Sequence, residues 1–116
     1  MELRSFDVDA GHHIDRFGSD FILSPLVRHD GGARTVVLHL PAGGVVGEHP
    51  AVADQLFCVV DGAGWVAGGD GVRRAIARGQ AAHWSSGERH RAETDDGLVA
   101  VVIEGTFTIE APRVVT

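Results

Sequence analysis

Sixteen glycines divide this 116-residue chain into short segments, and their spacing limits how the chain can fold more than any other feature. Glycine weakens a helix interior and favours turns. The segments between the glycines are short and rich in valine, isoleucine and leucine, and no window of 12 or more residues keeps a helical period. We therefore predict one all-β domain over residues 1–116, with strands at 21–28, 33–40, 55–60, 65–67, 72–76, 80–84 and 98–104.

The segments between these predicted strands carry turn residues. Turns are predicted at residues 30–32, 41–44, 61–64, 68–71 and 85–87, where glycine, aspartate, proline or serine gather. Residues 9–17 are predicted to form a helical turn. Within 34–40, alternate residues are apolar on both faces of the strand, which is typical of a strand covered on both sides by a second sheet or a second subunit.

Charge and composition exclude several classes of function. The net charge is −6, and the longest basic cluster is Arg73-Arg74, so the chain does not resemble a nucleic-acid-binding protein. The N-terminus lacks the apolar stretch of a signal peptide, and no apolar run approaches the roughly 20 residues of a membrane helix. These features predict a cytoplasmic protein. The single cysteine, Cys58, excludes an intrachain disulfide and is interpreted as a buried apolar residue. Lysine and tyrosine are both absent, which excludes a Schiff-base lysine and a tyrosine acid.

Two stretches of the chain carry regularly spaced glycine and polar residues. In the first stretch the spaced residues are Gly43, His49, Gln55 and Gly62. In the second they are Gly79, Ser85, Gly87 and His90. The glycines mark turns where a positive φ is least costly, with Gly43 and Gly62 at either end of a hairpin. Alternation predicts that residues 49 and 51 both face inward on their strand, and that residues 55, 57 and 59 all face inward on theirs.

These two stretches, about 43–62 and about 79–94, resemble the paired motifs of the cupin superfamily. The resemblance implies a cupin barrel, a double-stranded β-helix of jelly-roll-like form built from two antiparallel sheets, with a pocket at one end. In that family two histidines and a glutamate of the first motif, with one histidine of the second, usually hold a divalent metal.

The chain departs from the family pattern at four positions. Ala51 stands at the second histidine position, Gln55 at the glutamate position, Ser85 at the proline position and Thr94 at the asparagine position. The resemblance therefore leaves His49, Gln55 and His90 as candidate ligands for Zn, Ni, Mn or Fe. An amide oxygen supplies no negative charge, so a metal-free polar pocket is the competing interpretation. Glu48 could restore a charged ligand only if its strand is bulged.

Three further residues are predicted to line the pocket. Phe57 and Trp84 would supply aromatic contact area, and Arg34 at the rim would suit a carboxylate or enolate group, or else form a rim salt bridge. Of the other histidines, His12 and His13 are predicted on the surface and His83 on the outer face. His39 is predicted to be a core histidine bonded to the backbone.

Three functions remain open at this stage. The chain could be an enzyme of isomerase, cyclase, decarboxylase or dioxygenase type that uses His49 and His90, with or without a metal. It could instead be a non-catalytic module that binds or senses a small molecule in a depleted, metal-free pocket, or a structural protein with a vestigial pocket. No nucleophile constellation or phosphate loop appears, so catalytic residues are not assigned. The resemblance and the two apolar strand faces also predict a homodimer.

Overall fold

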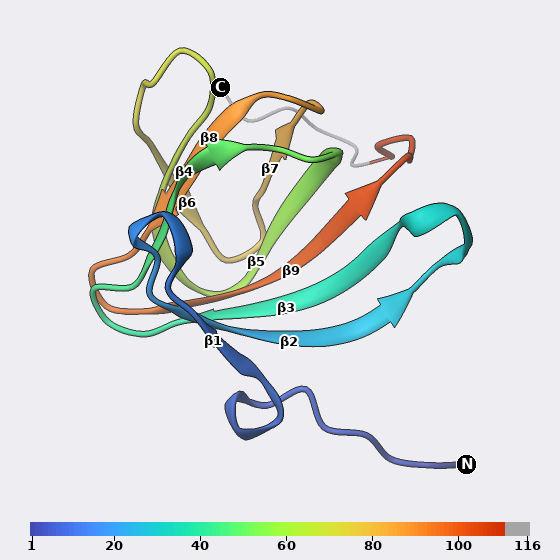
Figure 1. Cartoon of the computed structure of the whole chain (residues 1–116). Coiled ribbons are helices and arrows are strands. Elements are labelled where there is room, and N and C mark those ends of the chain that lie inside the picture. The colour runs from blue at the N-terminus through green and yellow to red at the C-terminus, as the bar shows by residue number, and fades with distance from the viewer. Residues whose placement is uncertain (111–116) are drawn as a thin grey trace.

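The computed structural model describes residues 1–110 as a curled sheet of nine antiparallel strands with three short 3-10 helices (Figure 1). The strands are β1 (His12–Ile14), β2 (Phe21–Arg28), β3 (Arg34–Leu40), β4 (Val45–Pro50), β5 (Asp54–Ala67), β6 (Arg74–Ala77), β7 (Ala81–Trp84), β8 (Arg89–Glu93) and β9 (Leu98–Gly105). The 3-10 helices are η1 (Val8–Ala10), η2 (Arg16–Gly18) and η3 (Asp30–Gly32). The predicted all-β class is confirmed. Among these residues no helix is long and apolar enough to cross a membrane.

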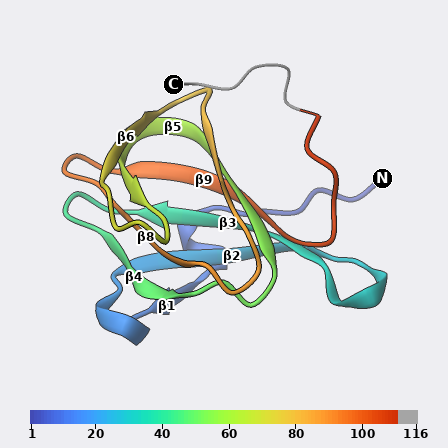
Figure 2. The same cartoon turned by 90° about the horizontal axis from the view of Figure 1, so that it is seen from above.

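The strand order is β1-β2-β3-β9-β5-β8-β4, and β6 and β7 also pair with β5. The first half of β5 pairs with β9 and β7, whereas its last residues pair with β8 and β6. Viewed from above, β5 therefore curves from one arm of the sheet into the other (Figure 2). This curvature brings β4 and β8 over the inner face of β5 and β9, which creates the interior where the polar side chains of the two motifs lie.

The turn predicted at residues 61–64 is wrong, because the chain continues there as one strand. The pairing of β5 with β9 shifts register between Val59 and Asp61, and Gly62 has a φ of +78°. A side chain at Gly62 would collide with the backbone oxygen of Gly97. The glycine therefore marks a bulge that bends β5 rather than a turn that ends it, and bulges of this kind increase the local twist of a strand.

The helical turn predicted at residues 9–17 is confirmed only at the two ends of that range, and its middle is a strand. Two 3-10 turns flank the short strand β1, which pairs with β2 so that His13 lies opposite Ile22. His12 and His13 are exposed, as predicted. The predicted backbone partner of His39 is present, since its Nε2 lies 2.9 Å from the carbonyl oxygen of Phe6. However, His39 is half-buried on the outer face of β3 beneath the N-terminal segment, and not in the core.

Each predicted strand overlaps an observed one, but β1, β4 and β8 were not predicted as ranges. β4 and β8 contain charged residues and histidines that hide the apolar alternation, including Glu48, His49, Arg89, His90 and Arg91. Their strand conformation depends on pairing with each other and with β5, which local propensity does not reveal.

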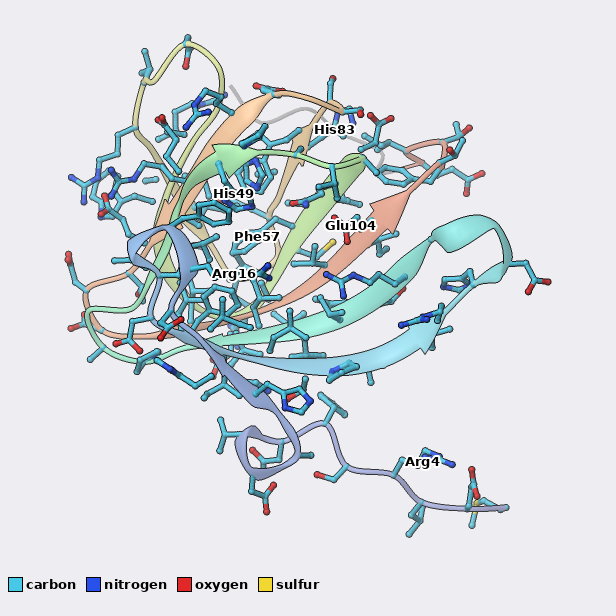
Figure 3. All side chains as sticks on the ribbon, viewed as in Figure 1. Arg4, Arg16, His49, Phe57, His83 and Glu104 are labelled. Atoms are coloured by element: carbon cyan, nitrogen blue, oxygen red, sulfur yellow. The ribbon has the colours of Figure 1, made fainter. Side chains whose placement is uncertain are left out.

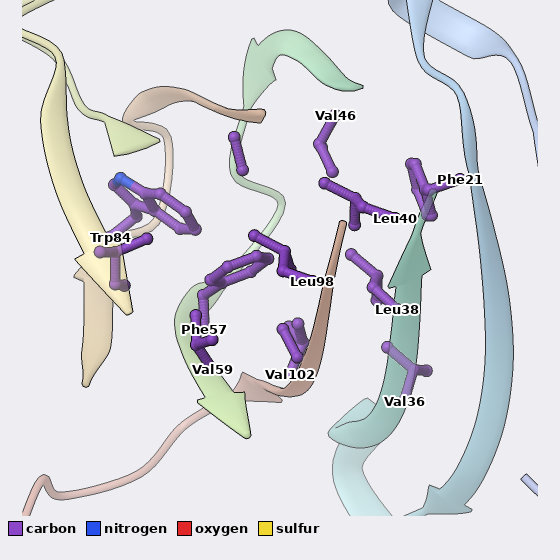
Figure 4. Close-up of a cluster of buried hydrophobic side chains, with 13 residues drawn as sticks. Phe21, Val36, Leu38, Leu40, Val46, Phe57, Val59, Trp84, Leu98 and Val102 are labelled. Carbon is purple, nitrogen blue, oxygen red and sulfur yellow. The ribbon is translucent and has the colours of Figure 1, made fainter. Parts of the chain in front are cut away.

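The core lies on the inner face of the curled sheet (Figure 4). On β9 every second residue is buried, in the order Leu98, Ala100, Val102 and Glu104, and the residues between them are half-buried on the outer face. Cys58 also lies half-buried on that outer face, where burial raises the pKa of its thiol. The predicted homodimer, in which a second subunit would cover this face, stays a prediction.

Candidate functional site

The two motif histidines lie directly opposite each other on neighbouring strands. His49 on β4 and His90 on β8 are paired Cα partners, and their ring centroids are 4.4 Å apart at an interplanar angle of 55°. His90 is 3% exposed, whereas His49 is half-buried. In Figure 3 the labelled His49, Phe57 and Glu104 come from β4, β5 and β9, around the interior of the curled sheet.

A bulge in β4 decides which way His49 points. Val46 pairs with Ala92 and His49 pairs with His90. Between these two pairs β4 advances by three residues while β8 advances by two, so β4 contains one extra residue. Without the extra residue, Val46 and His49 would face opposite sides of the sheet. With it, Val46 enters the core cluster while His49 also faces His90. Counting alternate residues from the start of β4 would therefore assign His49 to the wrong face of the sheet.

The bulge does not bring Glu48 to the histidines. Its Oε2 accepts from Arg89 Nε at 3.1 Å, and both side chains are more than half exposed. Glu48 therefore supplies no third donor beside His49. Ala51, at the family's second histidine position, lies just beyond the end of β4 and is 3% exposed.

Both imidazole rings are oriented by backbone carbonyl groups. His49 Nδ1 lies 2.7 Å from the carbonyl oxygen of Gly47, and His90 Nδ1 lies 3.2 Å from that of Glu88. A carbonyl oxygen only accepts hydrogen bonds, so Nδ1 of each ring is the donor. In the neutral form of each ring the lone pair then lies on Nε2, where it is available to a ligand.

The surroundings of His90 favour its neutral form. Burial lowers the pKa of His90 below its ordinary value of 6.5, and the electrostatic influence of the neighbouring His49 lowers it further. The bond to the carbonyl of Glu88 and the carboxylates of Glu88 and Glu104 oppose this, but burial dominates. His90 is therefore a neutral acceptor at neutral pH.

A row of polar residues crosses the other wall of the interior. Arg34 on β3 is the Cα partner of Glu104 on β9, Glu104 is the partner of Gln55 on β5, and Gln55 is the partner of Trp84 on β7. Arg34 Nε donates to Glu104 Oε2 at 2.8 Å, and Gln55 Nε2 donates to Glu104 Oε1 at 3.1 Å. The Glu104 side chain is 12% exposed, and that of Arg34 is 47% exposed. Arg34 therefore forms the rim salt bridge that was one of its two predicted roles.

The donor set does not fit a divalent metal. Gln55 presents its amide nitrogen to Glu104, and both carboxylate oxygens of Glu104 are already bonded. Within residues 1–110 no group of three or more His, Cys, Asp or Glu side chains could hold a metal ion. The pair His49 and His90 remains without a charged ligand to offset a dication. The assignment of His49, Gln55 and His90 as a metal site stays a prediction.

Five rings form a continuous series from the surface to the core. Phe17 stacks on His49 with centroids 4.9 Å apart and an interplanar angle of 6°. The ring of His49 contacts that of His90. The ring centroids of His90 and Trp84 are 4.5 Å apart, and those of Trp84 and Phe57 are 5.7 Å apart. Trp84 and Phe57 are 4% and 2% exposed, so both face inward as predicted but belong to the packed core. Each histidine consequently has neighbouring rings on two sides.

The remaining departures from the family pattern have structural roles at turns. Thr94 is 3% exposed, donates from Oγ1 to the carbonyl of Ala63 at 2.6 Å and accepts from Gly97 N at 3.0 Å. Ser85 N donates to Glu88 Oε1 at 3.0 Å. Thr94 therefore joins the turn after β8 to β5, and Ser85 begins the turn before it.

Sequence reasoning missed two residues of this region, Glu104 and Phe17. Glu104 could have been found, because it continues the inward alternation of Leu98, Ala100 and Val102 as a charged residue. Phe17 gave no comparable signal, since it lies in a segment predicted only as a helical turn. Its position depends on the contact between η2 and β4.

Two hollows in the described part of the chain lie elsewhere. One of about 160 Å³ lies beside Trp65, Arg73 and Glu93, and a larger groove of about 650 Å³ runs past Pro41 and Gly97. Neither is lined by His49 or His90. His90 is buried and His49 is half-buried, with the ring of Phe17 stacked on one face of His49.

Solved structures with the same architecture were found by comparison. A predicted oxalate decarboxylase from Thermotoga maritima matches with a TM-score of 0.78 and 21% identity, over 92% of this chain and 100% of that one. A Cupin 2 conserved barrel domain protein from Salinispora arenicola matches with a TM-score of 0.71 and 18% identity, over 91% and 89% of the two chains. A protein with a double-stranded β-helix domain from Klebsiella pneumoniae matches with a TM-score of 0.70 and 21% identity, over 90% of each chain. No protein-family model and no curated protein matches the sequence.

Proposed function

We propose that this chain, which has the cupin fold, binds a small oxygenated organic ligand at the interior face of its curled sheet, and that binding requires no metal. The observation that carries the proposal is the orientation of the two rings, His49 and His90. Each donates Nδ1–H to a backbone carbonyl, so each neutral ring offers an Nε2 lone pair on the same pair of strands. Two such acceptors suit hydroxyl groups, which donate a hydrogen bond to each nitrogen.

The opposite wall supports a ligand that also carries an anionic oxygen. Arg34 lies at the rim with its guanidinium half-exposed and only its Nε engaged by Glu104 in the contact described above. A guanidinium presents five N–H donors in a planar fork that matches a carboxylate. A hydroxy acid therefore has complementary groups for both walls, with its hydroxyl group as the donor to the histidines and its carboxylate as the acceptor at Arg34. The name of the Thermotoga maritima protein, a predicted oxalate decarboxylase, agrees with a small carboxylate as ligand.

A metal-dependent enzyme is the second candidate, and the paired histidines are the observation in its favour. Two imidazoles alone leave the charge of a dication uncompensated, and the carboxylate of Glu104 is engaged by Arg34 and Gln55. Metal-free binding is therefore the better-supported function. In it His90, kept neutral by burial, could also accept a proton from a bound hydroxyl group.

The experiment is calorimetric titration of EDTA-dialysed protein with the hydroxy acids glycolate, glycerate and malate, together with measurement of its metal content. We expect at least one of the three to bind the metal-free protein with one ligand per chain. Removing one ligand hydrogen bond costs about 1.4 kcal/mol, so His49→Gln and His90→Gln should each weaken binding about tenfold.

His83→Gln is the matched control, because His83 lies exposed on β7 outside the interior (Figure 3) and should leave the affinity unchanged. Binding that appears only after one equivalent of Zn²⁺ or Ni²⁺ is restored would favour the metal-dependent enzyme. No binding by any of the three acids, with or without metal, would reject the ligand class proposed here.

A further inference from the structure

The segment that contains η2 is hydrogen-bonded to β4 at the bulge that orients His49. Asp20 N donates to the carbonyl of Val45 at 2.7 Å, and Val45 N donates back to the carbonyl of Asp20 at 3.2 Å. Ser19, which is 8% exposed, accepts from Gly47 N through Oγ at 2.9 Å. This attachment places the turn Arg16–Gly18 beside β4 (Figure 1).

Phe17 has an unusual conformation for an exposed aromatic residue. Its φ is +59° and its ψ is +28°, and within residues 1–110 it is the only non-glycine residue with a positive φ. It is also 60% exposed. A bulky residue in this region is strained, and burial of the ring does not account for the strain. The ring is instead held flat against the imidazole of His49.

The backbone of Phe17 packs directly against the bulge in β4. A side chain at Gly47 would collide with the carbonyl oxygen of Phe17, so this approach requires glycine at position 47. The same glycine donates its N–H to Ser19 and accepts at its carbonyl from His49 Nδ1. Gly47 thus connects the turn directly to the hydrogen bond that determines the His49 tautomer.

We infer that Phe17 is a positioning residue for His49, and that the turn Arg16–Gly18 is a cover whose displacement opens the histidine pair to ligands. The inference deepens the proposed function and rests on it. The ring of Phe17 closes one face of His49 while His90 lies on the other side, and His90 itself is buried. The Phe17 ring therefore lies over one face of His49, and a ligand that approaches the histidine pair from that side meets the ring first. The strain at φ +59° makes displacement of this turn less costly than for a relaxed turn.

Site-resolved carbethoxylation with diethyl pyrocarbonate, followed by peptide mass spectrometry, tests the cover. In the parent protein we expect His49 to react at least tenfold more slowly than the exposed His12. Phe17→Gly removes the ring but suits the positive φ, so the turn is retained and His49 should react at least tenfold faster. Phe17→Tyr keeps a ring and should react at the parent rate.

Phe107→Gly is the matched control, because Phe107 contacts the ring of His83 edge-on at 6.0 Å, away from the bulge. It should change the rate at His83 and leave His49 unaffected. Equal His49 rates in the parent and Phe17→Gly, or a parent His49 as reactive as His12, would overturn the cover.

The positioning role has its own readout in the tautomer of His49, measured by long-range ¹H–¹⁵N correlation spectra. We expect the Nδ1–H tautomer to dominate in the parent and Phe17→Tyr, and the Nε2–H tautomer to appear in Phe17→Gly. An unchanged tautomer in Phe17→Gly would reject the positioning role. Neither experiment uses a carboxylate ligand. The cover can therefore be rejected while carboxylate binding is confirmed, and carboxylate binding can be rejected while the cover is confirmed.

Discussion

Gln55 Nε2 donates to Glu104 Oε1 at 3.1 Å, which makes the amide a partner of a buried carboxylate. The two residues are direct Cα partners on β5 and β9, although 49 positions separate them in the chain. The other carboxylate oxygen of Glu104, Oε2, accepts from Arg34 Nε, so the negative charge is offset by one cation and one neutral donor. The choice of glutamine at position 55 is explained by this contact, because a second carboxylate there would face the first.

The first prediction follows from that contact. Gln55→Glu places two carboxylates side by side, which raises their pKa values in the folded protein above those of the unfolded chain. A raised folded pKa means that stability is present at acid pH and is lost as the pH rises through it. We expect the variant to lose about 1–3 kcal/mol at pH 7, relative to the parent, and less at pH 4. Urea unfolding at both pH values measures this, and an equal loss at both would show that charge repulsion is not the cause.

The second prediction concerns the metal ligands that the resemblance to cupins implies are missing. The double variant Ala51→His, Gln55→Glu adds an imidazole and a carboxylate at the two positions where the family pattern has them, to an interior that already holds His49 and His90. We expect it to bind Zn²⁺, Ni²⁺ or Mn²⁺ at least about a hundredfold more tightly than the parent, which corresponds to about 2.8 kcal/mol. Ala51 is 3% exposed, so the larger side chain should lower stability by roughly 1–3 kcal/mol. Calorimetry on both metal-stripped proteins decides, and equal affinities would contradict the assigned geometry.

The third prediction uses the lowered pKa of His90. Because burial holds the folded pKa below 6.5, the unfolded chain takes up a proton before the folded protein does. Stability should therefore be complete above about pH 7 and should fall as the pH drops below 6.5 toward the folded pKa. His90→Gln removes this contribution and should flatten the pH dependence between pH 7 and pH 5. Thermal unfolding across that range provides the measurement, with His83→Gln as the control that should keep the parent slope.

The fourth prediction separates the backbone of Phe17 from its ring. Phe17→Ala and Phe17→Gly both lose the ring stacked on His49, but only glycine adopts φ +59° without strain. We expect Phe17→Ala to be less stable than Phe17→Gly by about 1 kcal/mol, although alanine is ordinarily the more stabilising of the two. Chemical unfolding of both variants tests the difference. If Phe17→Ala were the more stable, the positive φ at residue 17 would be wrong.

Much of the fold could be predicted from local patterns. Alternation placed Phe57 and Trp84 on the inner face and His83 on the outer face, and the structure agrees. Gly43, Gly62, Gly79 and Gly87, the glycines of the two motifs, all have a φ between +75° and +89°. The predictions failed where a bulge changes the parity of a strand, at Val46–His49 and at Val59–Asp61. A bulge inserts one residue opposite a partner strand. Its position therefore depends on how two strands pair and cannot be predicted from the sequence of one of them.

The sequence by itself determined the all-β class, the spacing of the strands and turns, and the inward direction of the residues that follow simple alternation. These depend on the conformational preferences of neighbouring residues, which act over a few positions. Only the tertiary structure decided that Glu104 binds Gln55 and Arg34, and that Phe17 covers His49. Those contacts join residues 32 to 70 positions apart, and they depend on the register of paired strands and on the bulges that shift it.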